Sequence, residues 1–230
     1  MKKQAFKIAF RDTIPVLTGY VFLGIGFGIL LSEKGYGFGW AFAMALFMVA
    51  GSGQYLAVSL LASQASLLST AVATLLVNAR HLFYGISLLD TYNDAGKKKP
   101  YLIFSLTDET YSLVTQNNPP EGISRHSYCF LVSILDHIYW IIGCVLGNVA
   151  GTLIPIDYTG VEFVLTALFV TMFVEQWIHH KNHRPAFIGV VCTAVCLMLF
   201  GSEIFLIPSM ALIALLLTVS KKTGRRDDDE

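Results

Sequence analysis

Long runs of apolar residues with little charge constrain this chain more than any other feature of its sequence. A helix needs about 20 such residues to cross the hydrocarbon core of a bilayer, which is roughly 30 Å thick. The chain contains seven apolar runs near or somewhat below that length, at residues 13–31, 40–62, 67–89, 128–153, 163–178, 186–200 and 204–219. The pattern predicts an all-α fold, a polytopic membrane helix bundle with about seven hydrophobic segments. The first three and the next three segments are candidates for an inverted repeat.

Charge is scarce and unevenly placed along the chain. Only 14% of the 230 residues are charged, whereas 54% are hydrophobic, and a soluble domain usually has about 25% charged residues. Eight of the charged residues lie in the last ten positions, so few remain to cover a surface in water. This distribution excludes a soluble enzyme, a nucleic-acid-binding protein and a disordered chain. We expect residues 1–220 to form a single transmembrane domain and residues 221–230 to form a charged cytoplasmic tail.

The positions of lysine and arginine predict the orientation, because these residues are enriched in cytoplasmic loops. Both ends of the chain are basic, so both termini are expected in the cytoplasm. Three full crossings from a cytoplasmic start would however leave the lysines at 97–99 outside. We therefore favour a broken or re-entrant second segment. The alternatives are a broken element at 101–116 that dips into the membrane, and seven true crossings with one terminus outside.

Small residues interrupt two of the apolar segments. Gly24 and Gly28 have the GxxxG spacing, which predicts close helix packing in lipid. In the second segment, Gly51, Ser52 and Gly53 precede Gln54, which predicts a helix break at mid-depth. The second half-helix would then direct free N–H groups toward a substrate carboxylate. The alternative is a packing notch of small residues in which Gln54 bonds to a neighbour.

The third segment carries polar residues in the middle of an apolar run. Asn78, His81 and Tyr84 share one face at a spacing of three, and Arg80 lies four residues before Tyr84. An arginine at the centre of a membrane helix costs about 2.5–3.5 kcal/mol on insertion scales, so it should face a polar cavity or a carboxylate. We interpret Arg80 as an anion contact beside a titratable histidine. A structural ion pair that locks the bundle is the alternative.

Two further sites combine acids with apolar surroundings. Asp108 and Glu109 lie in a short apolar stretch, where they either face solvent on a loop or enter the protein as partners for Arg80 or for an ammonium group. Asp136 and His137 are adjacent in the fourth segment. A buried acid beside a histidine predicts a proton relay, with a structural role as the alternative.

Four motifs occur in order along the chain: GSGQY at 51–55, VNARHLFYG at 77–85, SLTDETYSL at 105–113 and DHIYW at 136–140. Together they resemble the AzlC family of branched-chain amino acid exporters, the larger subunit of a two-component system. The resemblance implies export of leucine, isoleucine, valine and sometimes methionine across the bacterial inner membrane. It also implies a small AzlD-type membrane subunit as a partner. The chain lacks the GxxxxGK[ST] phosphate loop, which favours a secondary transporter driven by the proton gradient.

A site hypothesis combines these features with a zwitterionic substrate. The break at 51–53, Gln54 and Arg80 would bind the carboxylate, and Asp108 or Glu109 the ammonium group. Asn78 and Tyr84 would line the same site, and the substrate side chain would rest on residues such as Tyr55. His81, Asp108, Asp136 or His137 would couple a proton. No cofactor or metal is expected.

Two other classes of function remain open from the sequence. An intramembrane enzyme acting on a lipid or polyisoprenoid substrate would need convergent acids, often an Asp-rich metal motif, and the one run of aspartates here lies in the tail. A purely structural subunit would leave substrate binding to its partner. Leucine flux with and without the partner distinguishes these classes.

Overall fold

The computed structural model describes most of the chain. The described residues are 2–117, 119, 122–154, 163, 166–167, 170, 173–174, 177–178, 183–205, 208–209, 211–213 and 215–217. Within these, the side chains at 2, 76, 80, 82, 83 and 202–204 are outside the description, so those of Arg80 and Phe83 are too. The chain forms two compact units, Met1–Thr166 and Ala167–Glu230, which we treat separately. The single transmembrane domain and the charged tail at 221–230, which lies outside the described residues, stay predictions.

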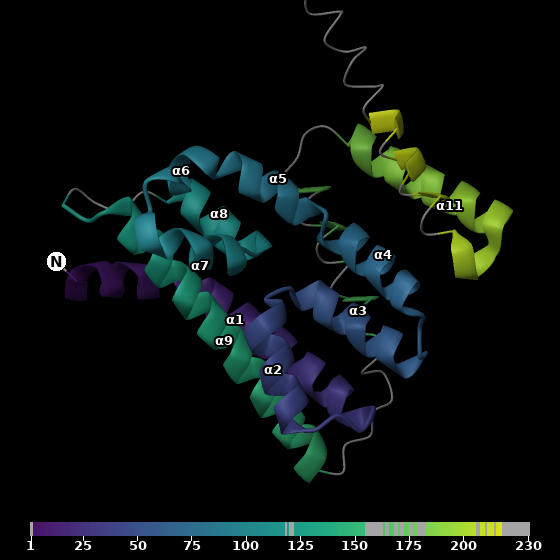
Figure 1. The fold of residues 1–230 in the computed structure, drawn as a ribbon, viewed down its shortest axis with the longest axis horizontal. Coiled ribbons are helices and arrows are strands. Elements are labelled where there is room, and N and C mark those ends of the chain that lie inside the picture. The colour runs from purple at the N-terminus through teal and green to yellow at the C-terminus, as the bar shows by residue number, and fades with distance from the viewer. Residues whose placement is uncertain are drawn as a thin grey trace, which may run out of the picture. The chain divides into compact units, whose positions relative to one another are not determined.

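The described part of the first unit is helical and contains no strand. Its elements are α1 (Lys2–Glu33), α2 (Phe38–Met48), α3 (Gly51–Ala62), α4 (Leu67–Asn78), α5 (Arg80–Ser87), α6 (Leu89–Asn93), the 3-10 turn η1 (Gly96–Lys98), α7 (Lys99–Phe104), α8 (Asp108–Gln116) and α9 (Arg125–Leu153). Figure 1 shows α1 and α9 crossing the first unit side by side. The all-α prediction is confirmed for this part of the chain.

Three described helices are long and apolar enough to cross a membrane. They lie at Lys3–Glu33 within α1, at Arg125–Leu153, and at Arg184–Gly201 within α11 (Arg184–Ile204) of the second unit. Helix α11 bends at Gly201, whose φ of 72° a side chain would disfavour. The predicted segments at 163–178 and 204–219 fall largely outside the described residues, so the count of seven is not confirmed.

Glycines let α1 and α9 approach so closely that their backbones touch. A Cβ added at Gly24 would lie 2.8 Å from the backbone nitrogen of Cys144, and one added at Gly28 or Gly147 would overlap the backbone of the opposite helix. The prediction of close packing from Gly24 and Gly28 is therefore confirmed. Successive glycines of α9 contact successive residues of α1, so residue numbers increase in the same direction along both helices. Helices α1 and α9 therefore run parallel. The expected inverted repeat is not confirmed, because it would make these two first segments antiparallel.

Helix α9 has an exposed apolar side and a buried side that carries polar residues. Ile138, Ile142 and Leu146 lie four residues apart and are exposed, whereas Asp136 and Trp140 are buried. A helix that is apolar outside and polar or small inside is suited to lipid rather than water. The polar side chains of α9 therefore point into the unit.

The second predicted segment is broken, as expected. Helix α2 ends at Met48, and the chain turns at Val49 (φ 22°) and Ala50 (φ −147°) before α3 begins at Gly51. The break thus lies just before the glycines rather than at them. The glycines form the first turn of α3, where Gly51 lets the Trp140 ring come within 3.1 Å of the position of a Cβ.

The third predicted segment is also divided, which the sequence did not predict. Its residues form α4, α5 and α6, with a turn at Ala79 between α4 and α5. The stretch at 101–116 forms α7 and α8, which pack against α9 and bury Leu102 and Val114. It is therefore a broken, packed element and not a solvated loop.

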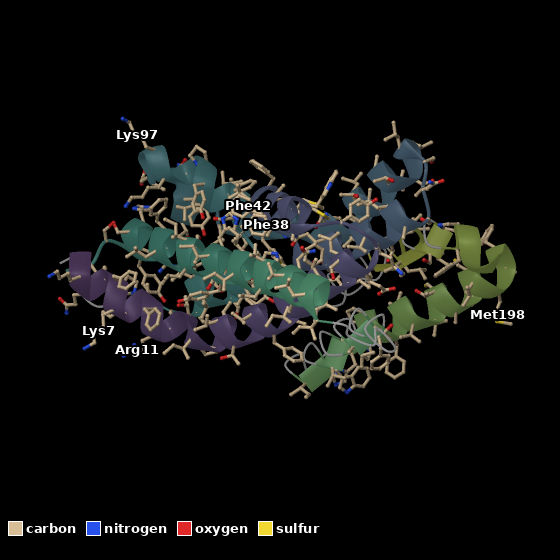
Figure 2. The ribbon with its side chains drawn as sticks, turned by 90° about the horizontal axis from the view of Figure 1, so that it is seen from below. Lys7, Arg11, Phe38, Phe42, Lys97 and Met198 are labelled. Carbon is tan, nitrogen blue, oxygen red and sulfur yellow. The ribbon has the colours of Figure 1, made fainter. Side chains whose placement is uncertain are left out.

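Basic residues gather at one end of the parallel pair. The ammonium group of Lys98 donates a hydrogen bond of 2.8 Å to Ser127 Oγ, near the start of α9. Figure 2 shows Lys97 at the same end of this pair as Lys7 and Arg11 of α1. Three full crossings would have placed the lysines at 97–99 on the side of the membrane opposite the N-terminus. In the structure, these lysines lie at the same end of the helix pair as the basic N-terminus.

Candidate functional site

The first turn of α3 contacts α9 and α4 through polar groups. The indole N–H of Trp140 donates a short hydrogen bond to Gln54 Oε1, and Gln54 is fully buried. A Cβ added at Gly53 would lie 3.2 Å from Asn78 Nδ2, so the amide of Asn78 lies directly over the glycine. Gly53 therefore contacts Asn78 of α4, and Gly51 and Gln54 contact Trp140 of α9.

Tyr55 serves the packing of α3 on α1. Its hydroxyl donates a 2.7 Å hydrogen bond to the carbonyl of Leu23, and its ring meets Phe27 edge-to-face at 5.7 Å. The side chain is fully buried. Its predicted contact with a substrate side chain stays a prediction.

The start of α8 carries a hydroxyl that caps the helix. Thr107 Oγ1 accepts the backbone N–H of Thr110 at 3.2 Å, as a helix N-cap does. The Thr110 hydroxyl, fully buried, donates a 2.7 Å hydrogen bond to Asp136 Oδ2. The first turn of α8, which Thr107 caps, therefore places the Thr110 hydroxyl against Asp136 of α9.

Tyr20 of α1 connects the same helix start to Glu109. Its hydroxyl donates to Glu109 Oε2 at 2.7 Å and lies 2.6 Å from Thr107 Oγ1. Its ring meets Trp140 edge-to-face at 5.4 Å. Tyr20 therefore joins the α8 hydroxyls to the α3–α9 contact.

Three buried polar atoms of the candidate site have no hydrogen-bond partner among the described residues. They are Gln54 Nε2, a donor, and two acceptors, Asn78 Oδ1 and Asp136 Oδ1. Asp136 is 1% exposed and Gln54 0%. Buried polar groups in proteins are nearly always bonded, so these atoms are available to hydrogen-bond to water or to a polar ligand.

The adjacent Asp136 and His137 form hydrogen bonds with different helices. His137 Nε2 lies 3.2 Å from the carbonyl of Ala45, which only accepts, so Nε2 carries the proton. Nδ1 then accepts from the hydroxyl of Tyr101 at 3.0 Å. A tyrosine hydroxyl is protonated near neutral pH, and burial raises the pKa of Tyr101 further. His137 thus joins α2 to α7, while Asp136 faces α8.

The predicted polar face of the third segment meets α8. His81 Nδ1 lies 3.1 Å from the carbonyl of Asn78, and its ring meets Tyr84 edge-to-face at 5.9 Å. Tyr84 in turn stacks on Tyr111 of α8 at 4.6 Å. Asp108 begins the same helix. The side chain of Arg80 lies outside the described residues, so its predicted anion contact stays a prediction.

Three residues of this site were missed by sequence reasoning. Tyr20, Thr110 and Trp140 each bond or contact a predicted residue, but none stands out in an apolar run. A signal did exist at Thr107, because a threonine followed by two acidic residues is typical of a helix N-cap and its first turn. It could have placed Thr110 in the first turn of a helix beside Asp108 and Glu109.

The second unit carries no candidate metal site in its described part. No group of three His, Cys, Asp or Glu side chains that could hold a metal ion occurs among the described residues. His183 stacks on Trp177 at 4.0 Å. An apolar cavity of about 370 Å³ in this unit is lined by Phe173, Val174, Trp177, Ala186, Phe187 and Val190.

Comparison with known proteins identifies relatives along nearly the whole chain. The family model described as AzlC protein matches residues 15–154. The chain is 40% identical over 218 residues to the branched-chain amino acid transport protein AzlC of Bacillus subtilis, covering 95% of this chain and 86% of that one. It is 42% identical over 219 residues to a Helicobacter pylori protein described as an uncharacterized membrane protein, covering 95% and 96% of the two chains. The inner membrane protein YgaZ of Escherichia coli is 24% identical over 212 residues, covering 86% and 81%.

No solved structure matches the chain. The family match covers more than half of the sequence, and several relatives are named as membrane proteins. Together with the three helices that are long and apolar enough to span a bilayer, these relatives identify a membrane protein. The chain belongs to the AzlC family.

Proposed function

We propose that this chain is a secondary transporter that exports branched-chain amino acids across the bacterial inner membrane. The relative from Bacillus subtilis, at 40% identity, is named as a branched-chain amino acid transport protein. We further propose that the proton gradient drives export and that a small AzlD-type membrane subunit assembles with the chain. The family resemblance supports the partner, and the absence of a phosphate-loop motif in the sequence supports a proton-driven mechanism.

One observation carries the proposal at the level of the site. Gln54 Nε2 and Asp136 Oδ1 are a buried donor and a buried acceptor without partners among the described residues, beside a broken helix. An unbonded polar group inside a membrane protein costs several kcal/mol. The carboxylate of a bound amino acid would accept a hydrogen bond from Gln54 Nε2, and Asp136 Oδ1 would remain able to accept a proton.

The proposed roles follow from this chemistry. The amide groups of Gly51, Ser52 and Gly53, together with Gln54 and Arg80, would bind the carboxylate, because a helix N-terminus favours an anion.

The remaining predicted residues complete the site. Asp108 or Glu109 would bind the ammonium group, and Asn78 and Tyr84 would line the same space. Tyr55 would contact the apolar side chain.

Proton coupling needs a titratable group inside the protein. His81, Asp108, Asp136 and His137 were the candidates from the sequence. The geometry favours Asp136 over His137, because His137 has both ring nitrogens engaged in helix contacts and Asp136 Oδ1 has no partner among the described residues. We propose Asp136 as the group that binds the transported proton.

The placement of basic residues in the first unit supports a cytoplasmic location for the N-terminus, and the basic residues at 221–226 support the same location for the C-terminus. Lys98 bonds to Ser127 at the start of α9, and α9 runs parallel to α1. The basic N-terminus, the lysines at 97–99 and Arg125 are therefore at one end of the helix pair. Cytoplasmic loops are rich in such residues, so we propose that this end faces the cytoplasm.

The decisive experiment reconstitutes the chain in liposomes with and without its small partner. We expect labelled leucine to move against its gradient when a proton gradient is applied. Absence of flux from both preparations, with the proteins folded, would refute transport. Flux carried by the partner alone would make this chain a structural subunit.

Arg80 provides the sharpest single substitution. Arg80→Ala should abolish leucine flux while leaving the complex assembled, because the carboxylate loses its counter-charge. The matched control is Arg11→Ala, since Arg11 is exposed and pairs with the neighbouring Asp12. Wild-type flux from Arg80→Ala would remove Arg80 from the site.

A further inference from the structure

Five side chains form a continuous hydrogen-bonded chain between an exposed carboxyl group and a buried one. Glu109 is exposed, and Asp136 is 1% exposed. The hydroxyls of Tyr20, Thr107 and Thr110 lie between them in that order. The four successive oxygen–oxygen distances are 2.7, 2.6, 3.0 and 2.7 Å.

The number of protons in this series of hydrogen bonds determines how many of its four contacts can be hydrogen bonds at once. Each of the three hydroxyls supplies one proton, and a carboxylate supplies none. With Glu109 and Asp136 both ionised, three protons serve four contacts, so one contact between two oxygens lacks a proton. One added proton completes all four bonds, and two added protons leave one proton with no acceptor in the chain. The geometry is therefore suited to one bound proton.

That single proton can sit at either end. If Glu109 holds it, Glu109 donates to Tyr20, Tyr20 to Thr107, Thr107 to Thr110, and Thr110 to ionised Asp136. If Asp136 holds it, every donor and acceptor in the chain is reversed. The N-cap bond to Thr107 survives in both states, because the Thr107 oxygen accepts the Thr110 N–H in addition to one hydroxyl.

We propose that Glu109 and Asp136 share one proton through the hydroxyls of Tyr20, Thr107 and Thr110. We also propose that this series of hydrogen bonds is the path by which a proton reaches Asp136. In the transfer, Glu109 loses its O–H proton to Tyr20, each hydroxyl passes its own proton to the next oxygen, and Asp136 gains the last one. Four O–H bonds break and four form, and the net result is one proton moved. The link to transport rests on the proposed function, but the sharing of the proton does not.

Other titratable groups on the elements packed against α9 do not interrupt this chain. Helix α2 has no titratable residue. Asp108 lies beside Glu109 at the start of α8. The groups that bond elsewhere are Asp12 with Tyr128, Tyr101 with His137, Tyr111 with Ser87 and Lys99 with Asn93. Through the bonds given above, Asp136 is connected to two titratable groups, Tyr20 and Glu109.

Infrared spectroscopy of the purified full chain tests the shared proton without any transport assay. The C=O stretch of a protonated carboxyl group is recorded near neutral pH in the wild type, in Glu109→Gln and in Asp136→Asn. The side-chain amide introduced in either variant can donate a hydrogen bond, so all four hydrogen bonds can form without an added proton. We expect each single substitution to remove the same protonated-carboxyl band.

The alternatives give different spectra. If Asp136 holds a proton of its own, Asp136→Asn removes the band and Glu109→Gln leaves it, and that result overturns the proposal. The converse result, or no band attributable to either residue, also overturns it. The matched control is Tyr139→Phe, which removes a buried hydroxyl contact between α1 and α9, to Thr13 at 3.2 Å, outside the chain. This variant must keep the band.

The path to Asp136 is tested by leucine flux in liposomes under a proton gradient. Thr110→Val replaces the hydroxyl by a methyl group of similar size and should lower flux by about tenfold or more, the scale of a lost proton-transfer group. Thr110→Ser keeps the hydroxyl and should retain most of the flux. Equal flux from the Val and Ser variants would refute the path. If the wild type itself shows no leucine flux, the proposed function is refuted, whereas the infrared test of the shared proton is unaffected.

Discussion

The contact between α1 and α9 makes a quantitative prediction for one glycine. In Gly28→Ala, the new Cβ would overlap the backbone of α9 at Cys144 and Asn148 and lie 2.8 Å from the carbonyl carbon of Gly147. Gly19 lies in the same helix, and a Cβ there would meet no heavy atom within 4 Å. Gly19→Ala is therefore the matched control.

The two substitutions share one energy term and differ in another. Alanine is better than glycine in a helix by about 1 kcal/mol, and this gain applies at both positions. Overpacking at Gly28 costs about 1–3 kcal/mol. Separation of the helices would also lengthen the bond from Asn148 Nδ2 to the Gly28 carbonyl, already 3.3 Å, which is worth about 1 kcal/mol. We expect Gly28→Ala to be about 2–4 kcal/mol less stable than Gly19→Ala.

Thermal and denaturant unfolding of the detergent-solubilised chain, followed by circular dichroism, measures this difference. About 3 kcal/mol corresponds to more than a hundredfold change in the unfolding equilibrium. A Gly28→Ala protein as stable as Gly19→Ala would mean that α1 and α9 do not touch through their backbones. The parallel arrangement deduced from the same contacts would then also be wrong.

Three further predictions concern the site and the orientation. Trp140→Phe should destabilise the protein by about 1–3 kcal/mol, because it leaves Gln54 Oε1 buried without its donor; denaturant unfolding measures this, and unchanged stability would contradict it. Tyr101→Phe should cost about 1 kcal/mol, because His137 Nδ1 loses its donor while the ring remains in place; a drop in melting temperature checks it, and an unchanged melting temperature would argue against the bond. A cysteine at Lys98 should react with a membrane-impermeant thiol reagent from the cytoplasmic side, and labelling from outside would reverse the proposed orientation.

Several features of this protein could be predicted from local sequence alone. The apolar runs predict helices, because only a helix satisfies its own backbone in lipid. Gly24 and Gly28 predict a close helix contact, and the glycines at 51 and 53 predict a break in the second segment. Each of these depends on the backbone of a few neighbouring residues, so a short stretch of sequence is sufficient.

Other features depend on pairs of residues that are far apart in the chain. The turn at Ala79 divides an apolar run that contains no glycine or proline near it. Tyr20 and Glu109 are 89 positions apart, and Gln54 and Trp140 are 86 apart. No periodicity in the sequence links such pairs, because their proximity depends on how the helices pack.

Asp136 and His137 illustrate the division between sequence and tertiary structure. The sequence by itself determined that an acid and a histidine lie inside an apolar helix, where each needs a polar partner. Adjacent residues on a helix point about 100° apart, so only the packing of α2, α7 and α8 around α9 decided which partner each received. The sequence determined the helices and their polar content, and the tertiary structure decided which polar groups meet, because hydrogen bonds between helices require both position and direction.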